Sequence, residues 1–423
     1  MSVIIRRIKR SAHMIKNILM FRTNDASFGQ FNFMVDIMAA EYEKLGCHVE
    51  FIDIMSDRFG EELIDKLKHN RYDAAFSSNC IGEAEVRFAD GENVYDHFGV
   101  PFVEFIGDHP MDHFKHIIKS GKQFYLKYVD RDHISFIKEC CSNVKGAVFI
   151  PHSGMQRARK IRDYSYEEYA SRKYGLVMIG NHLDRAKVEQ ELIGMPALQR
   201  RLAFEMIDYL LDNRNESLDN AFHKVFNDNG LGEMHGPEYG MLCQQFLKVP
   251  LYVRSYVREE VVRYICASGL EFDIFGGGWS SLSADELGNA RVHPAVPFGE
   301  VAEIYADSQI VLNVNAWFKN GTHERVSAAM NNGAASLTDH SIYLDELFLT
   351  DERDKEALFM YDISTPQDVP YMIDELLSDK DRLYNASVRG RKFAEENYSV
   401  SVMAKKYLEA ADSMIHGDRV GLL

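Results

Sequence analysis

The chain has 423 residues, of which 46% are hydrophobic and 26% charged, a composition typical of a globular protein with two domains. Its formal net charge of −16 would repel a phosphate backbone, which disfavours a role in DNA or RNA modification. No apolar run approaches the roughly 20 residues of a membrane-spanning helix, and the basic opening lacks the apolar stretch and cleavage site of a signal peptide.

The basic opening is interpreted as a solvated leader or, alternatively, as an amphipathic surface anchor. The six cysteines contain no CxxC pair, and the adjacent Cys140 and Cys141 would make a poor disulfide framework. The sequence therefore predicts a reduced, cytoplasmic protein without a structural zinc site.

Short apolar runs then alternate with longer helical patterns, which predicts βαβ units and a parallel sheet. The loop after the first strand contains no G-x-G-x-x-G and no P-loop, which argues against a dehydrogenase or an ATPase. We expect a doubly wound first domain over residues 14–162. Its predicted strands are Ile18–Phe21, His48–Ile52, Ala74–Ser77, Phe102–Ile106, Phe124–Val129 and Ala147–Ile150.

A second series begins at residues 176–179 and is interrupted by helical patterns at about 195–250. We interpret these helices as an insertion that could form a lid or the surface of a homo-oligomer. The second Rossmann-like domain is expected over 163–392, and the helical tail 393–423 could return to the first domain. Its predicted elements are a helix at Arg254–Ser268 and strands at Leu176–Ile179, Phe272–Phe275, Ile310–Val314, Ala335–Leu337 and Leu358–Tyr361.

The segment from Tyr305 to Phe348 indicates a phosphate site, because it reads as strand, polar loop, helix and strand. Thr322 is the expected N-cap of the helix, whose first N–H groups and positive dipole end would face a diphosphate. Gly321 would let the backbone approach closely, and Arg325 would add a fixed positive charge.

Three further arginines are candidate phosphate ligands. Arg254 and Arg258 are four residues apart on one predicted helix, so both could point at one ligand. Arg185 follows the Leu176–Ile179 strand on the side where ligands bind. For Arg254 and Arg258, a solvated helix face is the alternative interpretation.

The first domain offers a candidate catalytic base. Asp108 and His109 follow the Phe102–Ile106 strand directly, so they should lie at the cleft. His109 could accept a proton from the acceptor, with Asp108 orienting its ring. The alternative is a turn at the strand end with Asp108 as a local cap. His133 and His152 are weaker candidates for the same role.

A series of short motifs between residues 252 and 410 forms a further pattern. They are Phe275–Trp279 (FGGGW), His293–Phe298, Leu312–Asn315 (LNVN), His323–Val326 (HERV), Ala329–Gly333 (AMNNG), Leu337–Asp339 with Tyr343–Leu344, and Ala394–Tyr398. Together they resemble the C-terminal domain of the CgeB-like, spore-maturation-type glycosyltransferases, a GT-B group related to the group 1 glycosyl transferases.

The resemblance implies a GT-B fold, with two Rossmann-like domains facing a cleft, and a nucleoside-diphosphate sugar as donor, with a UDP-sugar favoured. The base would lie against Val296, Pro297 and Phe298, and the diphosphate near Gly276, Gly277, Gly278 and Trp279, with Asn315 and His323 nearby. Group 1 enzymes carry a ribose-binding Glu where this chain has Ala328, and Glu324 could replace it. GT-B enzymes generally use helix dipoles and arginines in place of a metal, so neither a metal nor another cofactor is expected.

Two alternatives to glycosyl transfer to an unidentified acceptor remain open at this point. One is a sugar-nucleotide epimerase of the same fold. The other is a non-catalytic protein that binds sugar nucleotides in surface-polymer assembly, which Ala328 supports.

Overall fold

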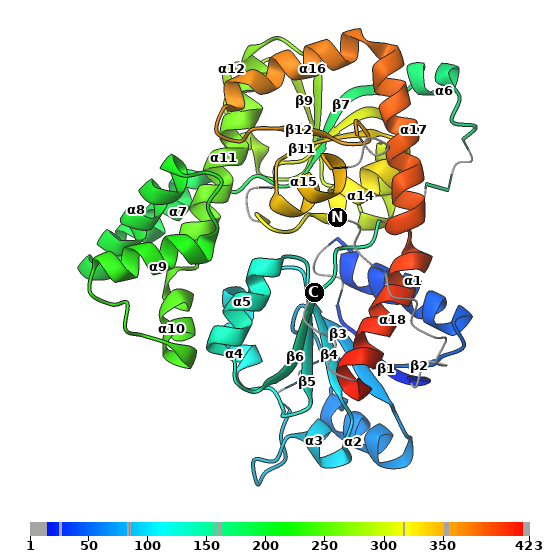
Figure 1. The fold of residues 1–423 in the computed structure, drawn as a ribbon, viewed down its shortest axis with the longest axis vertical. Coiled ribbons are helices and arrows are strands. Elements are labelled where there is room, and N and C mark those ends of the chain that lie inside the picture. The colour runs from blue at the N-terminus through cyan, green and yellow to red at the C-terminus, as the bar shows by residue number, and fades with distance from the viewer. Residues whose placement is uncertain are drawn as a thin grey trace.

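The computed structural model describes residues 15–24, 28–82, 84, 86–154, 158–159, 162–315, 318–350 and 355–417. Within them, two six-stranded parallel sheets form two domains, each with helices on both faces (Figure 1). The predicted pair of Rossmann-like domains is therefore confirmed. No helix in these ranges is both long enough and apolar enough to cross a membrane. The basic segment 1–14 and the end of the tail, 418–423, lie outside the described residues.

The first sheet has the order β2-β1-β3-β4-β5-β6. Its strands are β1 (Asn17–Arg22), β2 (His48–Asp53), β3 (Ala74–Ser78), β4 (Phe102–Ile106), β5 (Phe124–Tyr128) and β6 (Val144–Phe149). The helices of this domain are α1 (Gln30–Lys44), α2 (Phe59–His69), α3 (Val94–Phe98), α4 (Phe114–Ile117) and α5 (Arg131–Cys140). All six expected strands are present, with shifts of a few residues at their ends.

The second sheet has the order β12-β11-β10-β7-β8-β9. Its strands are β7 (Tyr174–Ile179), β8 (Phe272–Phe275), β9 (Ala290–His293), β10 (Ser308–Leu312), β11 (Ala335–Asp339) and β12 (Phe359–Tyr361). Its helices are α6 (Tyr166–Ala170), α7 (Arg185–Ile193), α11 (Lys248–Ala267), α12 (Ala284–Leu287), α13 (Val301–Ala306), α14 (Glu324–Asn331), α15 (Ile342–Phe348) and α16 (Val369–Ser378). The short edge strand β9 has no counterpart among the predicted strands.

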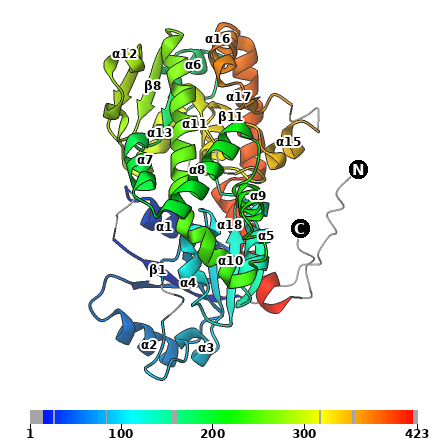
Figure 2. The ribbon, with the colours of Figure 1, turned by 90° about the vertical axis from the view of Figure 1, so that its left-hand side faces the viewer.

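The helical insertion consists of α8 (Ala197–Asp212), α9 (Leu218–Asp228) and α10 (Gly236–Cys243). It leaves the second domain and packs against α4 and α5 of the first (Figures 1 and 2). The contact is close, because a Cβ at Gly240 would lie 2.2 Å from the ring of Phe114. The ring of Tyr239 lies 6.3 Å from that of Phe136, between centroids. The insertion therefore bridges the two domains of one chain along this face.

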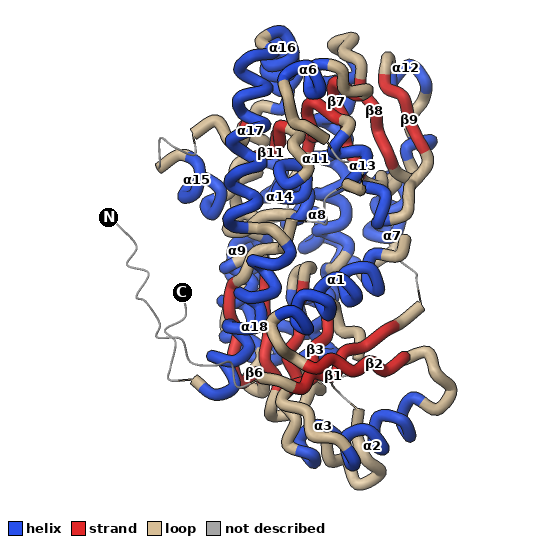
Figure 3. Tube along the Cα trace, turned by 90° about the vertical axis from the view of Figure 1, so that its right-hand side faces the viewer, coloured by secondary structure: helices blue, strands red, loops and turns tan. Residues whose placement is uncertain are grey.

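The C-terminal helices α17 (Lys380–Asn397) and α18 (Val400–His416) connect the domains on the other side (Figure 3). Helix α18 packs beside α1 on the first sheet. Its Tyr407 donates a hydrogen bond from its hydroxyl to the carbonyl of Pro151, at 2.9 Å. Ile18 and Met20 of β1 belong to the core beneath α1 and α18, whereas Leu19 faces the opposite layer.

Candidate functional site

A cavity of about 150 Å³ lies between the domains, at the carboxyl ends of β7 and β8. Ligands bind at this edge of parallel sheets because turns and helix N-termini converge there. Several predicted donor-site residues line it: Gly276, Val296, Phe298, Glu324 and Arg325. The other residues that line it were not predicted donor ligands: Phe28, Gln30, Ile179, Gly180, Asn181, Phe275, Ala295, Val301 and Tyr305.

Two turns, one after β7 and one after β8, form one wall of the cavity. The N–H of Gly277 donates to the Asn181 side-chain oxygen at 2.8 Å, which ties the turns together. A Cβ at Gly276 would lie 2.3 Å from the carbonyl oxygen of Gly180. Glycine is therefore required at position 276 for the two backbones to approach.

Gly278 and Trp279 lie behind this wall. A Cβ at Gly278 would lie 2.0 Å from the carbonyl oxygen of His182, and its φ of +85° also favours glycine. The Trp279 indole is 1% exposed, stacks on the His182 ring at 4.8 Å and donates to the carbonyl of Gly180 at 2.9 Å. Both residues hold the turns in place, and neither lines the cavity.

Two arginines, Arg258 and Arg325, lie close together beside the cavity. Side-chain nitrogens of Arg325 and Arg258 both lie 3.8 Å from the point that a Cβ at Gly180 would occupy. Arg258 also donates to the carbonyl of Asn181 at 2.7 Å. Burial, followed by the charges of Arg325 and Arg254, lowers the pKa of Arg258 to about 9. Because these positive charges repel one another, binding of an anion between them is favoured.

Helix α14 begins at the cavity, so the partial positive charge of its N-terminus lies there too. The predicted cap, Thr322, is wrong by one residue. The helix begins at Glu324, and the N-cap is His323, whose Nδ1 lies 3.4 Å from the backbone nitrogen of Arg325. Thr322 is buried behind the loop, with its hydroxyl 3.5 Å from the His323 carbonyl.

His323 and Glu324 form a close pair, with 2.6 Å between Nδ1 and Oε2. Burial, reinforced by the charge of Arg325, lowers the pKa of His323 to about 4, so its ring is neutral at pH 7. Burial opposes ionisation of Glu324, but the hydrogen bond from His323 and the Arg325 charge hold its pKa well below the ordinary value. The site therefore contains an ionised carboxylate that can accept hydrogen bonds from hydroxyl groups.

The apolar wall of the cavity is built from both domains. Val296 and Phe298 line it from the second domain, and Phe28 lines it from the first. The N–H of Phe298 donates to the carbonyl of Phe28 at 2.9 Å, and its ring meets Phe33 edge-on at 5.6 Å. Pro297 caps the short turn that follows and does not line the cavity.

Gly321 and Asn315 support the loop before α14. A Cβ at Gly321 would lie 2.1 Å from the carbonyl oxygen of Val129, so this glycine permits a close approach to the first domain. Gly321 is not among the residues that line the cavity. The Asn315 backbone N–H donates to the Asp339 carboxylate, and its side-chain amide donates to the Phe318 carbonyl at 3.2 Å.

The remaining two predicted arginines differ in their surroundings. Arg185 lies 3.6 Å from the Glu259 carboxylate and 5.0 Å from the centre of the Tyr256 ring, and it does not line the cavity. Burial lowers the pKa of Arg254, while the charge of Asp108 opposes this shift. The charge of Arg325 acts on Arg254 in the same direction as burial.

The expected pairing of Asp108 with His109 is wrong. His109 Nε2 lies 3.3 Å from Asp219 of α9, and its Nδ1 accepts from the N–H of Met111 at 3.2 Å. Asp108 instead lies 3.4 Å from His113. Burial disfavours the charged form of His109, but the Asp219 carboxylate outweighs burial and raises its pKa. Since both ring nitrogens have partners, this geometry does not favour His109 as a base.

His152, which follows β6, lies nearer to the donor cavity. Its ring centre is 6.1 Å from that of His323, and its Cε1 is 3.2 Å from the point that a Cβ at Gly107 would occupy. Burial lowers its pKa, against the charges of Glu324 and Asp108, so the ring is neutral at pH 7. Among the described residues, neither nitrogen of His152 has a hydrogen-bond partner. A neutral imidazole of this kind can accept a proton.

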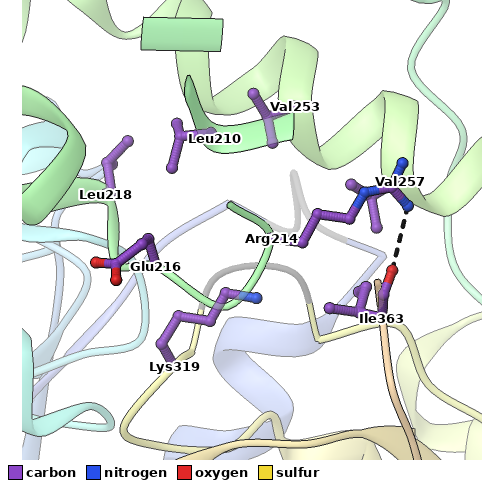
Figure 4. A pocket seen from close by; sticks show the side chains of 8 residues that line it. All are labelled: Leu210, Arg214, Glu216, Leu218, Val253, Val257, Lys319 and Ile363. Carbon is purple, nitrogen blue, oxygen red and sulfur yellow. Dashed lines mark hydrogen bonds between the residues drawn. The ribbon is translucent and has the colours of Figure 1, made fainter. Parts of the chain in front are cut away.

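A second cavity, of only about 20 Å³, lies where the insertion joins the second domain (Figure 4). Arg214 spans it and donates to the carbonyl of Ile363 at 3.1 Å, while Lys319 points in from the opposite loop. This space holds about one water molecule, so it is too small for a sugar.

Comparisons with known proteins agree with this architecture. Residues 257–409 match a family model described as glycosyl transferase-like. A glycosyltransferase from Rickettsia africae has a TM-score of 0.52 at 8% identity, with 96% of this chain and 100% of that chain covered. HepE of Anabaena, in complex with UDP and glucose, has a TM-score of 0.52 at 10% identity, covering 94% and 100%.

An alpha-glucosyltransferase in complex with UDP-glucose and DNA containing an abasic site has a TM-score of 0.53 at 10% identity. The alignment covers 93% of this chain and 99% of that chain. No curated protein matches the chain. The protein therefore has the GT-B glycosyltransferase fold, with a glycosyl transferase-like sequence over most of its second domain.

Proposed function

We propose that this protein is a glycosyltransferase that takes a sugar from a nucleoside diphosphate, with a UDP-sugar as the favoured donor. The observation that carries the proposal is the cavity between the domains, where arginines, a helix N-terminus and an apolar wall meet. These are the features that bind a diphosphate and a nucleobase side by side. The motifs of the second domain favour an enzyme of the CgeB-like group, which is related to the group 1 glycosyl transferases.

In this proposal the diphosphate binds Arg325 and Arg258 at the start of α14. The base lies against Val296 and Phe298, and Glu324 accepts hydrogen bonds from the ribose. When the bond between the anomeric carbon and the diphosphate oxygen breaks, negative charge grows on that oxygen. Fixed arginines and helix N–H groups stabilise this charge, which is usually the largest contribution to catalysis.

The acceptor approaches from the first domain. His152 is the group best placed to accept the proton of the acceptor hydroxyl as its oxygen bonds to the anomeric carbon. His109 is a positioning residue in this arrangement, because its ion pair with Asp219 fastens the insertion to the first domain. The acceptor is not a nucleic acid in this proposal, since the net charge is −16.

We also propose that the protein acts in the cytoplasm and that donor binding needs neither a metal nor another cofactor. None of its six cysteines forms a disulfide within the described residues, as a reducing compartment would require. The arginines and the start of α14 would supply the positive charge that a metal contributes in other transferases.

The test is isothermal titration of the protein with UDP, UDP-sugars, ADP and GDP, without added divalent cations. We expect saturable binding of UDP, and at 100 times its Kd a stabilisation of about 2.7 kcal/mol. If a UDP-sugar binds and is consumed only when an acceptor extract is present, the epimerase alternative is excluded. If no nucleoside diphosphate binds, the transferase proposal fails and the non-catalytic alternative is preferred.

A further inference from the structure

A group of potential metal ligands lies in the first domain, away from the donor cavity. Ligand atoms of Cys80, Glu104 and His116 all lie within 4.8 Å of one another. Cys80 follows β3, Glu104 lies within β4, and His116 belongs to α4. Three elements distant in sequence thus bring a thiol, a carboxylate and an imidazole together on one side of the first sheet.

Glu104 is the feature of this group that needs an explanation. Its exposed fraction is 0%, and in the described part of the chain neither carboxylate oxygen has a hydrogen-bond partner. Its Oε2 lies 3.5 Å from Nε2 of His116, which is longer than a normal hydrogen bond. A buried carboxylate is costly unless it is paired, hydrogen-bonded or bound to a metal. The two oxygens of Glu104 therefore point to a cation as their partner.

The backbone and a neighbouring side chain fit the same interpretation. Asn79 and Cys80 have φ of +45° and +61°, a left-handed conformation that costs non-glycine residues free energy. The hydroxyl of Tyr128, on the strand β5 that pairs with β4, is buried without a hydrogen-bond partner among the described residues. Tyr128 or a water molecule could therefore complete a four-coordinate site.

We propose that Cys80, Glu104 and His116 bind a zinc ion. Zinc accepts sulfur, nitrogen and carboxylate ligands, whereas magnesium and calcium prefer oxygen alone. In a tetrahedral zinc site the ligand atoms lie about 3.6 Å apart, given bonds of about 2.0–2.3 Å. Ligand atoms that lie within 4.8 Å of one another would need to close by no more than about 1.2 Å to reach that geometry.

The consequence of the site would be structural. Asn79, next to Cys80, accepts a hydrogen bond from the N–H of Gly107 at 2.9 Å. Gly107 precedes Asp108 at the edge of the cleft. A zinc ion would join the turn after β3 to β4 and α4, and so hold the acceptor side of the cleft in place.

The test uses the whole protein, purified without a histidine tag and without chelators. Mass spectrometry should find zinc in stoichiometric amount, and removal by a chelator should lower the melting temperature until zinc is restored. Cobalt titrated into the metal-free protein should give a thiolate-to-cobalt absorption band. The Cys80→Ser and Glu104→Gln variants should bind cobalt at least about 10-fold more weakly, and Cys80→Ser should lose the band.

Cys266→Ser is the control, because Cys266 is a thiol that lies in α11 of the second domain, outside the proposed site. It should bind cobalt as the parent protein does. The proposal is overturned if the metal-free parent gives no thiolate band with cobalt, or if Cys80→Ser keeps it. Should Cys80→Ser fail to fold, the parent titration and the Glu104→Gln variant decide the question.

Discussion

Arg325 gives the sharpest test of the donor site, and the change to make is Arg325→Met. Its guanidinium lines the cavity beside Arg258 and has no hydrogen bond within the described residues, so methionine should leave the surrounding turns intact. A charge-assisted contact with a phosphate is worth about 1.5–3 kcal/mol, which corresponds to a Kd about 10- to 150-fold weaker.

The same substitution should not destabilise the free protein. The charge of Arg325 contributes to the low pKa of Arg258, so its removal relieves a repulsion. Isothermal titration with UDP measures the Kd, and thermal unfolding without ligand measures stability. Arg201→Met is the control, because Arg201 is half exposed on α8 and pairs with Glu205. A Kd within about threefold of the parent, with stability unchanged, would refute the arginine cluster as the diphosphate site.

His152→Ala should lower turnover by about 10²–10⁴-fold and leave the Kd for UDP unchanged. Because the pKa of His152 is lowered, activity of the parent protein should fall only at pH below about 6.5. A larger loss of turnover in His109→Ala than in His152→Ala would contradict the assignment of His152 as the base. Asp219→Asn should reduce the free energy of unfolding, measured in urea, more at pH 6 than at pH 9. The pKa of His109 is raised in the folded protein, so its ion pair with Asp219 stabilises the fold fully at pH values below the pKa of His109 in the unfolded chain. This stabilisation is lost as the pH rises through the pKa of His109 in the folded protein. Equal losses at both pH values would count against the pair. Gly276→Ala should lower the melting temperature, because its Cβ would lie 2.3 Å from the carbonyl oxygen of Gly180. Gly277→Ala should be tolerated, because its Cβ would lie 3.7 Å from the nearest atom, the side-chain oxygen of Asn181. Similar melting temperatures for the two variants would disprove the role of the close turn.

The sequence predicts much of the fold because buried parallel strands leave a strong local signal. Apolar runs such as Phe102–Ile106 and Phe272–Phe275 coincide with β4 and β8. Strand β9 (Ala290–His293) has no such run, since it is short and lies at the sheet edge with partly exposed side chains. The cap of α14 was misplaced by one residue, because Thr322 is the commoner capping residue and only the fold shows that it is buried.

Contacts between residues far apart in the sequence could not be predicted from local patterns. The partner of His109 is Asp219, on a helix that returns to the first domain from the insertion. No local pattern indicates that the adjacent Asp108 lies instead beside His113. The zinc ligands proposed for Cys80, Glu104 and His116 follow no ligand-spacing motif, so a search for such motifs could not find them. By contrast, the glycine turn and the HERV segment carried a local signal that placed Gly276, Glu324 and Arg325 at the cavity.

The measurement that tests the central claim most directly is a crystal structure of the protein with UDP bound. We expect the diphosphate within hydrogen-bond distance of Arg325 and Arg258 at the start of α14, with the base against Phe298. Nucleotide bound elsewhere, or a diphosphate that contacts neither arginine, would contradict it.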